Sequence, residues 1–107
     1  MMITTQVQDS SRGAPGARIP VELDIFVTGQ GWKEVGYGIT NTEGRIDEFG
    51  EPAAAGVYRL MFDVATNMPD AFFPSIAITF EVRDASERYH IPLVLSPFGY
   101  TTYRSGE

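Results

Sequence analysis

Hydrophobic and polar residues alternate along much of this chain with a period of two, which is the pattern of half-buried β-strands. In the first alternating run, residues 21–27, the polar positions include Glu22 and Asp24. We therefore expect the face of the strand that carries them to be exposed to solvent. Phe26 breaks that alternation, and a large apolar side chain there packs on a neighbouring element or closes a subunit interface. The apolar positions fall into three runs: Val21, Leu23, Ile25 and Val27; Tyr58, Leu60 and Phe62; and Ile76, Ile78, Phe80 and Val82.

The last eighteen residues, 90–107, predict a strand, a turn and a second strand. An apolar run leads to Ser96–Gly99, and an aromatic end that carries Tyr103 and Arg104 follows. Glycine, proline and asparagine separate the other runs at short intervals, as in small antiparallel sandwiches. The sequence therefore predicts an all-β fold, an antiparallel β-sandwich that forms one domain over residues 1–107. The end of the chain has more large apolar residues than one small core needs. Each of them fits either a subunit interface or ordinary sandwich core: Leu93, Leu95, Phe98 and Tyr100.

Composition limits the classes of partner. The 107 residues include 43% hydrophobic residues and no cysteine, so a core has to form without disulfides, as suits a reducing compartment. The formal net charge of −6 disfavours nucleic acid as the main partner, because phosphate binding needs a clustered basic face. No apolar run approaches the roughly 20 residues of a membrane span. We expect a cytoplasmic protein without a leader peptide or a membrane contact.

Few residues suit catalysis. His90 is the single histidine, and from the residues alone a structural histidine is the better interpretation. Arg45 follows a glycine in a turn, which is usually a solvated position. Tyr103 and Arg104 are equally compatible with capping the last strand. One histidine, no cysteine and dispersed carboxylates predict no metal site, and no motif predicts a cofactor.

Several segments resemble the transthyretin-related 5-hydroxyisourate hydrolases. The chain ends in HIPLVLSPFGYTTYRSGE, which is similar to the HVPLLLSPxGYSTYRGS-like end of that family. Residues 40–46, TNTEGRI, match its TNxDGR turn, and residues 72–74, FFP, match its FFPEV strand entry. Residues 3–9, ITTQVQD, followed by the SRG of 11–13, are similar to its opening strand and loop.

The resemblance implies a transthyretin-like sandwich that assembles as a homotetramer, a dimer of dimers with sites where the dimers meet. The family carries a short helix between residues 63 and 72, but here the connection is shorter and contains Pro69. We therefore expect this helix to be reduced or absent. The implied activity is hydrolysis of a cyclic amide in urate or methylurate breakdown, without metal or cofactor.

The resemblance also implies roles for individual residues. His90 matches a catalytic histidine, and a histidine can take a proton from water and return it to a leaving nitrogen. Arg45 matches a substrate-binding arginine, whose fork of donors can hold a carbonyl and stabilise charge on it. Tyr103 and Arg104 match the YR of a tail that folds into the family's active site. The tail then departs from the pattern, because Ser105 is followed by Gly106 and Glu107.

Gln6 is the main departure from the family, which has a catalytic histidine at this position. Glutamine donates and accepts hydrogen bonds but does not titrate near neutral pH. Either activity has been lost, as in transthyretin, or the protein acts on a related ring. Because His90, Arg45 and the YR pair are retained, we favour an N-methylated 5-hydroxyisourate, formed from methylxanthines such as caffeine, with Gln6 orienting water or a ring carbonyl. The alternatives are a non-catalytic carrier of small aromatic molecules and a sandwich domain that mediates protein contacts.

Overall fold

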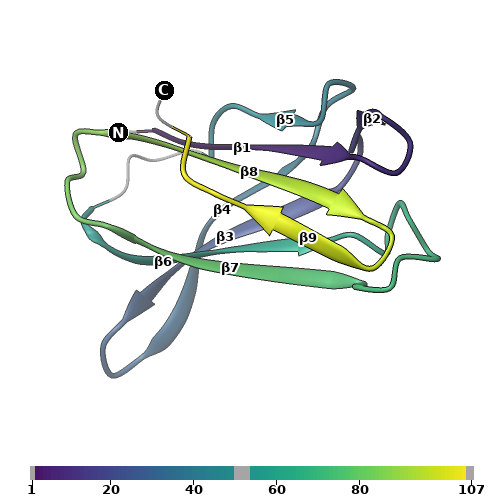
Figure 1. The fold of residues 1–107 in the computed structure, drawn as a ribbon. Coiled ribbons are helices and arrows are strands. Elements are labelled where there is room, and N and C mark those ends of the chain that lie inside the picture. Colours follow the sequence, from purple (N-terminus) through teal and green to yellow (C-terminus); the bar gives the residue numbers. More distant parts are fainter. Residues whose placement is uncertain (1, 50–53, 106–107) are drawn as a thin grey trace.

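The computed structural model describes residues 2–49 and 54–105, which form a sandwich of two β-sheets (Figure 1). One sheet has the order β2-β1-β8-β9, with β5 also paired to β1, and the other has the order β4-β3-β6-β7. The strands are β1 (Met2–Asp9), β2 (Ala14–Pro15), β3 (Pro20–Val27), β4 (Gly31–Ile39), β5 (Arg45–Ile46), β6 (Gly56–Asp63), β7 (Ser75–Val82), β8 (Arg88–Ser96) and β9 (Gly99–Thr102).

The strands confirm the all-β prediction. The three alternating runs became β3, β6 and β7, and the end of the chain became β8, a turn and β9. Alternation alone assigns no strand to residues 31–39, yet these form β4 at the edge of its sheet. Among the described residues there is no helix, as expected for the shortened connection, and therefore none that could cross a membrane. Every strand pair is antiparallel except β1 with β8, which is parallel.

The core lies between the two sheets and is built from the alternate positions that the sequence indicates. Val7 and Leu93 from one sheet face Val21 and Leu60 from the other, and all four are fully buried. Leu95 is also buried, so the interpretation of Leu93 and Leu95 as interface residues is wrong, and ordinary core is correct. Two further candidates remain on the surface, Phe98 with 79% and Tyr100 with 42% of its surface exposed.

Asp24 departs from the prediction of a wet face on β3. Its side chain is buried, and both Nε and Nη2 of Arg59 donate to its Oδ2, at 3.2 and 2.9 Å. The Arg59 guanidinium in turn lies 4.2 Å from the centre of the Trp32 ring, which packs edge-on against Phe26. Trp32 therefore covers one side of the Arg59 guanidinium, and the large apolar residue that interrupts the polar face packs on Trp32 of the neighbouring strand β4.

Candidate active site

The parallel pairing of β1 with β8 places the candidate residues on one face. Thr5 points into the core, where its hydroxyl donates to the Ile91 carbonyl at 2.6 Å and ties the two strands together. The neighbours of Thr5 must then point outward, away from the other sheet. In the register of the two strands Thr4 lies beside His90 and Gln6 beside Pro92. Gln6 and His90 therefore share the outer face of this sheet.

Arg45 reaches the same face through a tightly constrained turn. The Asn41 side-chain oxygen accepts hydrogen bonds from the backbone N–H groups of Glu43 and Arg45, each at 2.9 Å. Gly44, at φ +78°, lies so close to β1 that its carbonyl accepts from the Val7 N–H at 2.7 Å. A Cβ at position 44 would stand 2.3 Å from the Val7 oxygen, so only glycine fits there. This close approach fixes where Arg45 leaves the turn.

Gln6 and Arg45 are direct partners across β1 and β5. Arg45 Nη1 donates to Gln6 Oε1 over a long 3.4 Å, and its Nε donates to Asp47 Oδ1 at 3.1 Å. With its oxygen turned to Arg45, the Gln6 amide presents N–H donors. The structure thus brings together two of the residues that the sequence singles out, 39 positions apart.

Thr4 and Ser105 both bind His90. Its ring Nδ1 lies 2.7 Å from the hydroxyl oxygen of Thr4, and its backbone carbonyl accepts from the Ser105 N–H at 2.9 Å. The chain that leaves β9 therefore runs back past the start of β8 and ends its described part beside His90 (Figure 1). Gly106 and Glu107, which carry the altered tail, lie outside the described residues.

Tyr103 and Arg104 occupy this returning segment. Tyr103 is 56% exposed. The Arg104 guanidinium lies 4.2 Å from the centre of the Tyr89 ring, and its Nη2 donates to Glu87 Oε1 and to the Arg88 carbonyl, each at 3.2 Å. Tyr89 is a core residue, whereas His90 faces outward. In the single chain Arg104 is thus held at the sheet edge rather than among Gln6, Arg45 and His90.

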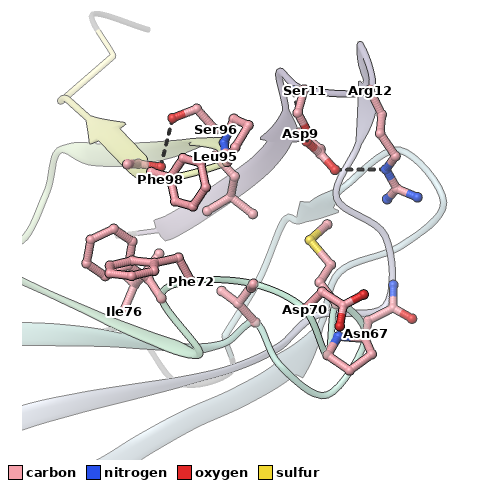
Figure 2. Close-up of a pocket in the computed structure, with 17 residues that line it drawn as sticks. Asp9, Ser11, Arg12, Asn67, Asp70, Phe72, Ile76, Leu95, Ser96 and Phe98 are labelled. Carbon is pink, nitrogen blue, oxygen red and sulfur yellow. Dashed lines mark hydrogen bonds and ion pairs between the residues drawn. The ribbon is translucent and has the colours of Figure 1, made fainter.

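A separate cavity of about 470 Å³ opens at one end of the sandwich (Figure 2). Phe72, Ile76 and Phe98 line one side, and the Asp9–Arg12 ion pair of 2.8 Å lines another. None of the five candidate residues borders it. Without a histidine this cavity lacks a group that exchanges protons near neutral pH, so the outer face of β1 and β8 is the better candidate for hydrolysis.

The outer face combines a proton carrier, a fixed cation and a neutral donor. His90 can exchange a proton, Arg45 can hold developing negative charge, and Gln6 can donate to a carbonyl. Sequence reasoning missed Thr4, although its place two residues before Gln6 in an alternating strand puts it on the same face. Within the described ranges, no three His, Cys, Asp or Glu residues are grouped so that they could hold a metal ion.

The comparisons with known proteins agree with this architecture. Residues 3–105 match the family model described as the HIUase/Transthyretin family. The chain belongs to this family. Over 95% of its length it is 36% identical to a 5-hydroxyisourate hydrolase of Pseudomonas aeruginosa, of which it covers 89%. The family resemblance drawn from the end motif and the TNxDGR-like turn is therefore confirmed.

Two further family members differ in size and activity. The chain is 39% identical, over 95% of its length, to the uric acid degradation bifunctional protein TTL of Arabidopsis thaliana, and spans 36% of that protein. It superposes on sea bream transthyretin, solved in complex with thyroxine, with a TM-score of 0.89 and 26% identity over 98% of this chain and 95% of that one. The transthyretin-like sandwich is confirmed, and the family includes both enzymes and a thyroxine-binding protein.

Proposed function

We propose that this protein is a hydrolase that opens the six-membered ring of a 5-hydroxyisourate-type substrate in urate or methylurate breakdown. The observation that carries the proposal is that Gln6, Arg45 and His90 share one outer sheet face, with Arg45 contacting Gln6 and Thr4 holding His90. The relatives named 5-hydroxyisourate hydrolase support the reaction class.

In the proposed mechanism His90 takes a proton from water, whose oxygen forms a bond to the carbonyl carbon of a ring amide. Arg45 stabilises the negative charge on the carbonyl oxygen. The carbon–nitrogen bond then breaks, and His90 returns the proton to the departing nitrogen. Tyr103 and Arg104 hold the ring, which for Arg104 requires that its guanidinium leave Glu87. These steps use side chains alone, without metal or cofactor.

Gln6 supports an N-methylated ring as the preferred substrate. Methylation removes ring N–H donors but leaves the carbonyl oxygens, and a neutral amide N–H can still donate to a carbonyl. A hollow of about 270 Å³ is lined in part by Gln6, Ala14 and Pro15, and the last two offer apolar contact for a methyl group. A charged or titrating residue at position 6 would suit the unmethylated, ionisable ring better.

We further propose that four copies assemble, with the outer face of β1 and β8 at the contact between dimers. The strands β7 and β9 each end a sheet, and their open edges are available for pairing with a second copy. Closure around a twofold axis would give the dimer, and two dimers the tetramer. An exposed face that carries the site would become a cleft shared by two subunits.

The test is the decay of freshly generated 5-hydroxyisourate and of its trimethyl analogue, followed by ultraviolet absorbance with the purified protein. We expect faster decay of the methylated ring and a loss of at least about a hundredfold in His90→Ala, the usual scale of general acid–base catalysis. Gln6→His is the matched variant, and it should shift the preference toward the unmethylated ring.

Acceleration of both rings alike would refute the methyl preference but keep the hydrolase. If neither ring decays faster than in buffer, the hydrolase proposal fails. The second candidate, a carrier of small aromatic molecules, is favoured by the superposition on transthyretin solved with thyroxine and by the neutral Gln6. Saturable binding of an aromatic ligand without turnover, lost in Arg45→Ala, would then identify the carrier.

A further inference from the structure

The Thr4 side chain contacts the ring of the single histidine. Its Oγ1 lies 2.7 Å from His90 Nδ1, although the two residues are 86 positions apart. The contact arises from the parallel register, in which Thr4 and His90 are direct partners. Next to it, the buried Thr5 hydroxyl bonds to the Ile91 carbonyl and fixes that register.

A threonine differs here from the carboxylate that often orients a catalytic histidine. Its hydroxyl is neutral, so it orients the imidazole without favouring the positively charged form as a carboxylate would. The same oxygen accepts a hydrogen bond from an Nδ1–H, in both the neutral and the protonated ring. Because threonine is branched at Cβ, its χ1 is restricted, and the direction of the hydroxyl is well defined.

We propose that Thr4 is a positioning residue that holds His90 in the tautomer with the proton on Nδ1, so that proton transfer to and from the substrate runs through Nε2. This inference rests on the proposed hydrolase function and adds a residue to it. Free imidazole side chains prefer the proton on Nε2, so the hydroxyl has to reverse an intrinsic preference. The bond to Thr4 persists while Nε2 gains and returns its proton.

The test compares Thr4→Val, which keeps the branched shape but removes the hydroxyl, with Thr4→Ser, which keeps the hydroxyl. Thr28→Val is the matched control, because Thr28 is an exposed threonine in the turn between β3 and β4, in the other sheet from His90. Nitrogen-15 NMR reports the tautomer without ambiguity in a protein freed of any histidine tag, since the chain has one histidine.

We expect the Nδ1–H tautomer in the wild type and in Thr4→Ser, and a majority of Nε2–H in Thr4→Val. In hydrolysis, kcat should fall about tenfold or more in Thr4→Val with KM within about twofold, because the interaction serves the transition state rather than binding. Thr4→Ser should recover most of the rate, and Thr28→Val should match the wild type in rate and in NMR.

A wild-type Nε2–H tautomer, or a Thr4→Val protein with unchanged tautomer and kcat, would overturn the proposal. An equal loss in Thr4→Val and Thr4→Ser would do the same, because it would point to packing. If the wild type hydrolyses neither ring, the proposed function fails and the positioning role fails with it. A protein that hydrolyses normally while Thr4→Val is unaffected refutes the role of Thr4 alone.

Discussion

Glu22 and Asp24 lie two residues apart on one face of β3 and form an unusual pair of carboxyl groups. Arg59 binds Oδ2 of Asp24, whereas Asp24 Oδ1 is buried with no hydrogen-bond donor among the described residues. When its carboxyl group is protonated, Glu22 can donate a hydrogen bond to the Asp24 carboxylate. The hydrogen bond with Asp24, followed by desolvation and repulsion from Asp24 and Glu34, raises the pKa of Glu22 to about 7, with Arg59 opposing the shift.

This pair predicts a pH-dependent stability. The pKa of Glu22 in the folded protein lies above its ordinary value of 4.5. Its contribution to the free energy of unfolding is therefore complete below pH 4.5 and is lost as the pH rises through 7. We expect the free energy of unfolding to fall by about 1 kcal/mol between pH 5 and pH 8, after allowance for solvent screening. Urea unfolding at the two pH values, at a fixed protein concentration, measures this difference in the free energy of unfolding.

Glu22→Gln is the matched variant for this measurement. Its neutral amide can donate to the Asp24 carboxylate at any pH, so the fall in the free energy of unfolding between pH 5 and pH 8 should be reduced. Equal slopes for wild type and variant would show that other groups cause the pH dependence.

The element that positions Arg45 is the turn from Asn41 to β5. It has no core of its own, and it is held by the Asn41 side chain and by the contact of Gly44 with β1. The first constraint is local, and the second is a backbone contact that only a glycine at position 44 allows. The position of Arg45 therefore depends on Gly44. The geometry of the candidate site thus depends on a turn rather than on a long strand.

Gly44→Ala should therefore damage both stability and activity. The positive φ costs alanine about 1 kcal/mol, and the contact with the Val7 oxygen adds about 2 kcal/mol or more, as overpacking does. Gly29→Ala is the control, because Gly29 has φ +83° but open space around it, and it should lose about 1 kcal/mol with unchanged hydrolysis. Thermal unfolding and the ultraviolet assay measure both effects. Equal losses in the two variants would argue against the close contact as the cause.

At the scale of the whole molecule, the two sheets have different outer faces. The outer face of β1 and β8 carries Gln6 and His90 and is joined by Arg45 from β5, whereas the outer face of β3 and β6 carries the Asp24–Arg59 ion pair. The first face carries the candidate site, whereas on the second face Arg59 pairs with the buried Asp24 carboxylate. In the proposed tetramer the first face therefore packs against its copy.

Val94→Arg tests that assembly. Val94 lies half-buried on the outer face of β8, between the core residues Leu93 and Leu95, so a charge there should separate the dimers. Sedimentation should give the mass of four chains for the wild type and of two for Val94→Arg, with hydrolysis lost. Val35→Arg, on the exposed edge strand β4, should remain a tetramer. A wild type that sediments as a single chain would refute the assembly.

The sequence by itself determined most of the strands, the sandwich and most candidate residues. Alternation with a period of two depends only on local backbone geometry, so β3, β6 and β7 could be recognised without a structure. The motifs around His90, Arg45 and Tyr103 indicated the family. They could be recognised in the sequence because each of these residues is close along the chain to the turn or strand that positions it. The departure at Gln6 was equally visible from the chain alone.

Only the tertiary structure decided which of these residues meet. The parallel partnership of β1 with β8 brings Thr4 to His90 across 86 positions, and no local pattern encodes such a register. The tertiary structure also brings Arg104 to Glu87 and Tyr89. In the other sheet it buries Asp24, which the local alternation had placed in water. The reason is physical: which side of a strand is polar follows from its own residues, but whether that side is exposed to solvent depends on distant segments that cover it.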